Sequence, residues 1–223
     1  EGKVLVPGMA EFVVTALRGK RPGKSLAEQL AAWKIFYKKF FHHQLDVESV
    51  RIPSRVEGFG RLIVVAKGFT LNQIYAVMVK HFKECWSYAT DLDKAIPDNA
   101  RDANRDGSYA IWARDRRDGD EENRNVSAHK AWGTKKPVFE PKMPWFTIAE
   151  LMLNGLMYWD ETGEHLDPDT WSSCPGSRDA RGYVPCMYCD SGRVKVSYDY
   201  PDVSSGDLRP RSAVSCELES GGA

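Results

Sequence analysis

The sequence predicts an α+β domain that follows a helical N-terminal extension, and three observations support this. Three segments between residues 25 and 159 carry helix-start signals followed by apolar residues at helical spacing. Short apolar stretches that fit buried strands lie between them. After Trp171 the helical signal stops, and short stretches joined by turn residues take over. The 223 residues therefore fit an extension at 1–50 and one domain at 51–223.

The first helix is expected to begin at Ser25, because Ser25 and Glu28 form a capping-box pair. The apolar residues that follow it at helical spacing are Leu26, Leu30, Trp33, Tyr37 and Phe40. This face predicts either a core contact or an oligomer contact, so a homo-oligomer through this helix is one possible assembly. The neighbouring basic residues, Lys34, Lys38 and Lys39, fit a solvated face.

Two further capping boxes, at 70–73 and 147–150, predict two more helices. The first leads into Ile74, Val77, Met78, Phe82 and Cys85, and the second into Leu151, Met152, Gly155 and Trp159. Strands are expected at 62–65, 109–112, 184–188 and 193–200. The polar stretches 91–107 and 114–142, which contain Gly and Pro, predict long surface loops.

Bulk composition excludes several classes of partner. Lys plus Arg equals Asp plus Glu at 31 each, so no net positive charge favours nucleic acid or an anionic membrane. No apolar run approaches the ~20 residues that a spanning helix needs, and the first residues lack a signal-peptide layout. The five cysteines are an odd number, which argues against a complete disulfide framework and favours reduced thiols.

The composition changes near residue 172. In residues 1–171, Glu, Gln, Trp, Lys and Met together occur 41 times, about a quarter of the positions. At that rate roughly nine would be expected among the 39 residues of 172–210, but only Lys195 and Met187 occur. Turn chemistry explains a loss of Trp and Met but not of ordinary surface residues such as Glu and Gln. The Tyr, Ser, Gly and Asp that dominate instead are typical of a recognition surface.

Several short sequence motifs in this chain resemble motifs of the C-type-lectin-fold variable proteins of diversity-generating retroelements, as found in archaeal viruses and poorly cultured lineages. The motifs are GFGRLIV at 58–64, TLNQ at 70–73, YAIWARD at 109–115, DEE at 120–122, ETGEHLD at 161–167, GSR at 176–178, VP at 184–185 and LRPRS at 208–212. The motifs at 161–167 and 176–178 are the most specific. The resemblance covers 51–215, and residues 1–50 match nothing in this family.

The resemblance implies a lectin-like fold, with helices flanking a small antiparallel sheet, and a variable region at about 172–210. In this family a reverse transcriptase substitutes bases at template adenines, and a randomised Asn codon cannot reach Lys, Glu, Gln, Met or Trp. These are the five depleted types. The implied variable positions are Asp179, Ala180, Arg181, Tyr183, Cys186, Tyr188, Asp190, Ser191, Ser197, Tyr198, Asp199, Val203, Ser204, Ser205 and Asp207. The implied framework positions are Trp171, Gly176, Ser177, Arg178, Pro185, Val196, Leu208 and Arg209.

The resemblance therefore implies binding rather than catalysis. The chain is expected to be a receptor or a tail-type adhesin at a virion or cell surface, with a variable protein or glycan as ligand. No cofactor, no metal, no nucleic acid and no membrane insertion are expected. Alternation along a strand means that Ser197 and Asp199 cannot share a face with Tyr198 and Tyr200. Part of the variable set must therefore be misassigned, or this stretch is a loop.

Two alternatives remain open at Cys186 and Cys189, which form a Cys-x-x-Cys. A zinc-stapled interaction module would need two more ligands, for which Cys174, Cys216 or His165 would have to fold nearby. A formylglycine-generating-type oxidase, which has a related fold, would use reactive cysteines, although fold alone does not grant that activity.

Two acidic stretches are weaker candidates for a metal or catalytic site. The stretch 102–107 begins like a calcium loop, but its twelfth position is Ala113 where a Glu belongs, so an Asx-rich turn is favoured. Glu161, Glu164 and His165 could form an acid–base or metal group, although charged residues at a helix end are common.

Overall fold

The computed structural model describes residues 24–216, and it has the α+β architecture that the sequence predicts. The helices are α2 (Leu26–Phe41), α3 (Leu71–His81), α4 (Leu92–Ala95), α5 (Ala103–Asp106), α6 (Ala128–Trp132) and α7 (Ile148–Thr162), with a 3₁₀ turn η1 (Glu121–Asn123). The strands are β1 (Arg61–Val65), β2 (Glu84–Ser87), β3 (Asp98–Asn99), β4 (Tyr109–Ala113), β5 (Trp171–Ser173), β6 (Ser177–Arg178), β7 (Val184–Asp190), β8 (Arg193–Asp199) and β9 (Leu208–Pro210).

The largest sheet has five strands in the order β2-β8-β7-β5-β9. Its centre is antiparallel, but β2 pairs with β8 and β5 pairs with β9 in parallel. The expectation of a purely antiparallel sheet was therefore wrong at both edges. Only sequential strands joined by a tight turn must pair antiparallel, and β2 and β9 reach the sheet through long connections. Two smaller sheets pair β1 with β4 and β3 with β6, both antiparallel.

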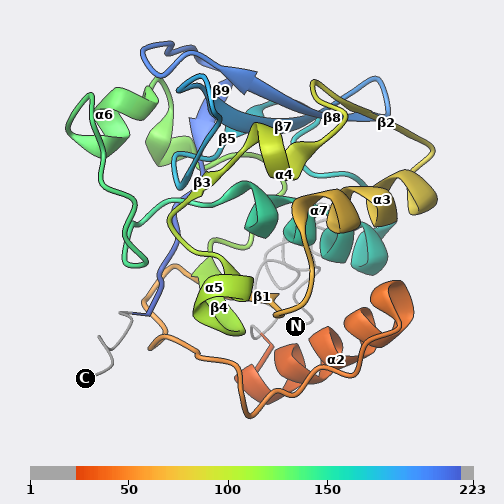
Figure 1. Cartoon of the computed structure of the whole chain (residues 1–223). Coiled ribbons are helices and arrows are strands. Elements are labelled where there is room, and N and C mark those ends of the chain that lie inside the picture. The colour runs from red at the N-terminus through yellow and green to blue at the C-terminus, as the bar shows by residue number, and fades with distance from the viewer. Residues whose placement is uncertain (1–23, 217–223) are drawn as a thin grey trace, which may run out of the picture.

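The elements stack in layers (Figure 1). The five-stranded sheet lies at the top of the view, α3 and α7 lie beneath it, the β1–β4 pair follows, and α2 closes the bottom. Helix α7 is buried between β1 and β7, and every residue from Ile148 to Met157 except Ala149 is buried. One hydrophobic core runs through all these layers. Helix α7 therefore covers one face of the five-stranded sheet.

The helix starts follow local sequence chemistry. All three capping boxes form, at Ser25 with Glu28, at Thr70 with Gln73 and at Thr147 with Glu150. Each satisfies two backbone N–H groups that the first turn would otherwise leave unpaired. The strands expected at 62–65, 109–112, 184–188 and 193–200 are confirmed as β1, β4, β7 and β8. The stretches expected to be loops contain the short elements α4, β3 and α5, and η1 and α6.

Helix α2 belongs to the common core. Trp33 donates from Nε1 to the Leu62 carbonyl at 2.9 Å, and the Tyr37 hydroxyl donates to the Val64 carbonyl at 2.9 Å. Both rings are buried, as is Phe36, which the spacing did not select, whereas Leu26 is exposed. The aromatic face therefore packs against β1, which confirms the core contact that the sequence predicts as one of two possibilities; a homo-oligomer stays a prediction. Residues 1–23 of the expected extension lie outside the described residues.

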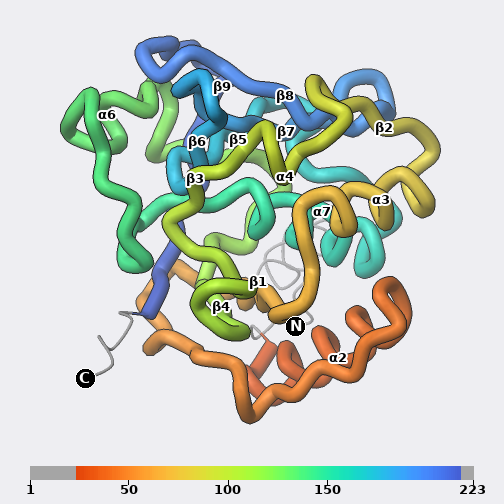
Figure 2. Tube along the Cα trace, viewed as in Figure 1, coloured from red at the N-terminus to blue at the C-terminus, as the bar shows by residue number. Residues whose placement is uncertain are grey.

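The segment 51–215 closes on itself at β4 (Figure 2). Arg51 bridges Tyr109 in parallel, and Val214 bridges Trp112 in antiparallel fashion. The last residues run from the sheet down to β4 (blue in Figure 2), so both ends of this segment flank one strand. Within residues 24–216, no helix combines the length and the apolar character that a bilayer crossing requires.

Candidate functional site: the outer face of the five-stranded sheet

Strands β7 and β8 separate an inner face from an outer face by simple alternation. Met187, Cys189, Val194 and Val196 point inward and belong to the buried core, and Met187 Cε lies against Gly155 of α7. Residues between them, such as Tyr188 and Lys195, point the other way. We define the outer face as the side of the five-stranded sheet that faces away from α7.

Four residues form a row across the outer face, one from each of four neighbouring strands. Trp86 of β2 is in register with Lys195 of β8, and Lys195 with Tyr188 of β7. Tyr188 then stacks on Trp171 of β5, with ring centroids 4.2 Å apart and planes within 8°. We call these four residues the aromatic row. Trp86 and Trp171 are 44% and 42% exposed, which is unusual for indole rings and leaves them free to contact a ligand.

Charged side chains border the aromatic row. The Lys195 ammonium lies 5.5 Å from the Tyr188 ring centroid and bonds the Asp190 carboxylate at 2.6 Å. The hydrogen bond from Lys195 lowers the pKa of Asp190 and raises the pKa of Lys195. Arg193 donates to Glu84 on β2 at 2.9 Å. The face therefore pairs flat aromatic surface with nearby charges of both signs, as recognition surfaces do.

A second aromatic group lies on the opposite side of the same strands, where β7 begins and β8 ends. Tyr183 stacks on Tyr198 at 5.1 Å and meets Tyr200 edge-on at 4.6 Å. The Arg181 guanidinium lies 4.2 Å from the Tyr198 ring centroid and 4.7 Å from that of Tyr183. We call Arg181, Tyr183, Tyr198 and Tyr200 the tyrosine cluster. A guanidinium over phenol rings is a favourable cation–π arrangement.

The implied variable positions mostly reach the surface but do not share one face. Exposed or half-buried members are Ala180, Arg181, Tyr183, Tyr188, Asp190, Ser191, Ser197, Tyr198, Asp199, Val203, Ser204, Ser205 and Asp207. Ser197 and Asp199 pair with Cys186 and Val184 on the outer side, while Tyr198 points to the other side. The conflict noted in the sequence thus arises because β8 is a strand whose two sides both carry implied variable positions.

Two implied variable positions are interior, which corrects their assignment to the ligand surface. Cys186 is fully buried, and its thiol pKa is raised by that burial. Asp179 is 2% exposed and holds the turn that precedes β7. Its carboxylate accepts from the backbone N–H groups of Arg181 and Tyr183 at 2.8 and 2.9 Å, so its charge is used internally.

The implied framework positions are largely buried: Gly176, Ser177, Pro185, Val196 and Leu208 in full, Arg178 and Arg209 in part. A Cβ on Gly176 would lie 2.6 Å from the Trp145 carbonyl oxygen, so only glycine fits there. Trp171 differs because it lies in the aromatic row. A fixed Trp171 would itself contact a ligand on the outer face.

A buried ion pair anchors the inner side of this segment. Arg211 donates from Nη2 to Asp167 Oδ1 at 2.7 Å and from Nε to Ser172 Oγ on β5 at 2.7 Å. The side chains of Arg211 and Asp167 are 2% and 0% exposed. Such a pair fixes geometry, because removing one partner would leave an uncompensated buried charge.

Sequence reasoning missed Trp86 and Lys195. Both are in the aromatic row because β2 pairs in parallel with β8, 109 residues further along the chain. No local signal encodes such a pairing. Strand β2 is only four residues long, and bends directly before and after it obscure its alternating pattern in the sequence.

The geometry gives no support to a Cys186–Cys189 site. Cys189 points inward and Cys186 outward, because they are three positions apart on one strand and an odd spacing places side chains on opposite faces. Burial raises the thiol pKa of both, which disfavours the reactive thiolate. In residues 24–216 no three His, Cys, Asp or Glu side chains converge as metal ligands would.

The weaker acidic candidates have structural partners. Glu161 bonds Arg61 at 2.8 Å, Glu164 lies 3.4 Å from Arg117, and His165 packs edge-on against Phe82. The stretch 102–107, whose sequence begins like a calcium loop, instead provides the N-terminal cap of α5. The Asp102 carboxylate accepts from the Asn104 backbone N–H at 2.8 Å.

Comparisons of the chain with protein-family models, with curated proteins and with solved structures find no match.

Proposed function

We propose that this chain is a ligand-binding protein with a C-type-lectin-like fold, whose 172–210 segment presents a retroelement-diversified surface. Its ligand is a protein or a glycan, and its role is that of a receptor or tail-type adhesin. The observation that carries the proposal is the separation of the two faces of β7 and β8. Inward side chains build the core, while the aromatic row and its charged border lie on a face that α7 does not cover.

Three further observations support this reading. The five residue types that Asn-codon randomisation cannot reach are depleted in 172–210. Thirteen of the fifteen implied variable positions are exposed or half-buried. Both ends of the segment 51–215, which carries the resemblance, pair with the same strand, β4.

A display library tests the proposal. Six surface positions, Ala180, Arg181, Tyr188, Asp190, Ser191 and Ser197, are randomised together to the fifteen residue types that an Asn codon reaches. Most members should remain protease-resistant, because these side chains hold little of the core. Selection on immobilised proteins and glycans should then yield binders whose affinity falls at least about tenfold when Trp171 is replaced by Ala.

A matched library randomises six buried positions, Val184, Pro185, Met187, Cys189, Val194 and Val196, to the same types. It should lose protease resistance in most members, because core volume is no longer conserved. Equal loss of folding in the two libraries would contradict the proposal. So would a surface-position library that folds but yields no binder to any panel member.

A further inference from the structure

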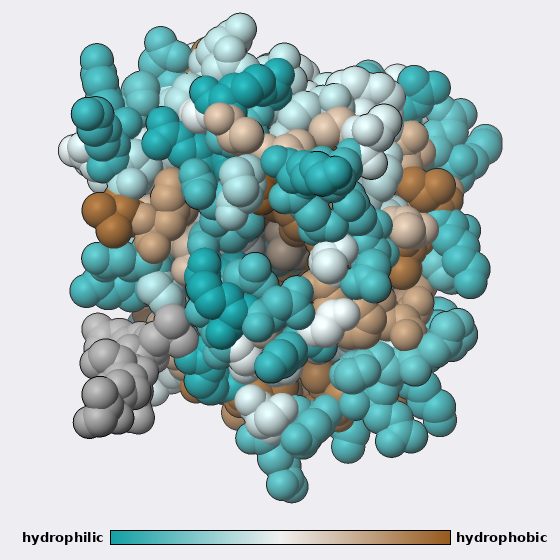
Figure 3. All heavy atoms as spheres, in the orientation of Figure 1, coloured by the Kyte–Doolittle hydropathy of each residue, from teal (hydrophilic) through white to brown (hydrophobic). Residues whose placement is uncertain are grey.

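A cavity separate from the outer face opens between α4 and α5. Its volume is about 310 Å³, and it is walled by the start of α3, by α4 and the residues after it, by α5, and by the adjoining ends of β1 and β4. In the space-filling view it is the hollow near the centre of the molecule (Figure 3). A volume of this size is at the lower end of small-molecule sites in proteins.

The floor of the cavity is apolar. Val65, Phe69, Ile74 and Ile96 line it, together with the ring of Tyr109. Val65, Ile74 and Ile96 are almost fully buried and belong to the core, so the floor is a rigid surface rather than a loop. An occupant would therefore bury an apolar body against these side chains.

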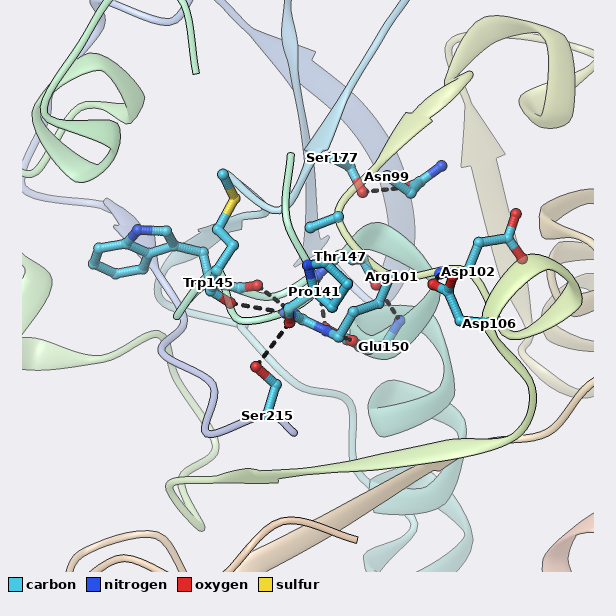
Figure 4. Close-up of polar contacts among 12 residues, drawn as sticks. Asn99, Arg101, Asp102, Asp106, Pro141, Trp145, Thr147, Glu150, Ser177 and Ser215 are labelled. Carbon is cyan, nitrogen blue, oxygen red and sulfur yellow. Dashed lines mark hydrogen bonds and ion pairs between the residues drawn. The ribbon is translucent and has the colours of Figure 1, made fainter. Parts of the chain in front are cut away.

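The one cation that lines the cavity is fully used (Figure 4). Arg101 donates to Glu150 through Nε and Nη2, at 2.7 and 2.9 Å. Its remaining N–H groups reach the carbonyls of Pro141, Met143 and Trp145 at 2.6–2.9 Å. Because Arg101 has no donor left and its charge is matched by Glu150, the cavity offers nothing to an anion.

The remaining polar groups favour a cation that can donate hydrogen bonds. Asp93 and Asp102 line the cavity, and no Lys or Arg pairs with either within residues 24–216. Both oxygens of Asp93 accept from backbone N–H groups of α3, of Leu71 at 2.8 Å and of Asn72 at 3.4 Å, so Asp102 is the carboxylate that a cation would meet. The Asp102 Oδ1 atom accepts from the Asn104 N–H, while Oδ2 has no hydrogen-bond partner there. The Tyr109 hydroxyl is also buried, but it lies beside the Arg101–Glu150 pair and Thr147, so its polar neighbours belong to the protein.

The geometry points to this cavity as a binding site for a small organic amine, with its apolar body on the floor and its protonated amino group beside Asp102. The inference does not depend on the diversified surface, because none of the residues that carry it belongs to the implied variable set. It gives the chain a second binding activity, at a site built from core elements.

Phenethylamine is a suitable probe, because it joins one apolar ring to one ammonium. In calorimetric titration of the full chain at low salt, we expect saturable binding with a Kd on the order of 0.1–1 mM, typical of a fragment of this size. The neutral analogue 2-phenylethanol should bind about fivefold more weakly, or worse. Added salt should weaken only the amine, because it screens the charge pair.

Two variants locate the site. Asp102→Asn retains an oxygen that caps α5, so the fold should persist while amine affinity falls about fivefold and phenylethanol affinity stays constant. Ala149→Leu fills the cavity and should weaken both ligands. Asp98→Asn is the matched control, since Asp98 is exposed, acidic and outside the cavity lining. It should change neither affinity.

Amide hydrogen exchange gives a readout that does not rely on substitution. Phenethylamine should slow exchange at the start of α3 and in residues 93–104, and leave β7 and β8 unchanged. The inference is overturned if phenethylamine shows no saturable binding, if Asp102→Asn binds it as tightly as the parent chain, or if the protection appears on β7 and β8 instead.

Discussion

The two sides of β7 and β8 use the same backbone for different purposes. On the inner side, Met187 and Val196 are 2% and 0% exposed and pack within the core beneath α7. On the outer side, Tyr188 and Lys195 occupy the neighbouring positions of the same strands, where their contacts are mainly with each other and with Trp171. At these positions, alternate residues of one strand therefore pack in the core and reach the surface.

This alternation would allow the surface side chains of a strand to vary while its backbone and core packing stay the same. A substitution on the outer side alters ligand contacts, but the ladder of backbone hydrogen bonds and the inner packing remain. A substitution on the inner side creates a cavity or leaves a charged group buried without its partner. Substitutions on the two sides should therefore differ clearly in their effect on stability.

The largest effect is expected at the buried ion pair. Arg211→Met should lower the free energy of unfolding by about 3–5 kcal/mol, because it leaves the Asp167 carboxylate buried without its partner. Arg193→Met makes the same chemical change at the exposed pair of Arg193 with Glu84. It should lower the free energy of unfolding by about 0.5 kcal/mol or less. Urea denaturation of both variants measures the difference. Similar losses in the two would break the comparison.

A smaller effect is expected for adjacent residues of one strand. Met187→Ala should cost about 2–4 kcal/mol, because a buried side chain is removed from beside α7. Tyr188→Ala should cost about 1 kcal/mol or less, since it removes the stacking on Trp171 and the contact with Lys195 at a partly exposed site. Thermal unfolding checks the order. A reversed order would show that the outer face, rather than the inner one, supports the fold.

The smallest perturbation is thiol alkylation of the native chain, read by mass spectrometry. Cys174 and Cys186 should react on the order of 10³-fold more slowly than in urea, because both are buried and burial raises their pKa. Cys85 is only half-buried, and burial raises its pKa to about 11.

The thiolate fraction of Cys85 should therefore grow as the pH rises, and its alkylation rate should increase about tenfold per pH unit from pH 7 to 10. Rapid labelling of Cys186 at neutral pH would contradict its burial and would revive the oxidase alternative. Cys216 is partly exposed and serves as the internal reference.

Local signals predicted much of this fold. The capping boxes at Ser25, Thr70 and Thr147 located three helices, because those side chains act within one turn. Short stretches bounded by turn residues located β7 and β8. The parallel pairing that brings Trp86 beside Lys195 could not be predicted, since it joins positions 109 residues apart. The cavity beside Asp102 was missed for the same reason, because elements from separate parts of the chain wall it.

The role of α2 was also beyond sequence reasoning. Its aromatic spacing fitted a core contact and an oligomer contact equally well. Only the partners decide between them, and these are the Leu62 and Val64 carbonyls of β1. Leu26 is exposed and Phe36 is buried, although spacing alone selected Leu26 and not Phe36. The buried face of α2 is thus slightly rotated from the one that spacing predicts.

Sequencing the 3′ end of this gene across many copies from its natural population tests the central claim most directly. The account predicts substitutions confined to about 172–210. They should fall at surface positions such as Tyr188, Ser191 and Ser204, and spare Gly176, Met187 and Val196. A uniform segment, or substitutions spread evenly over inner and outer positions, would contradict it.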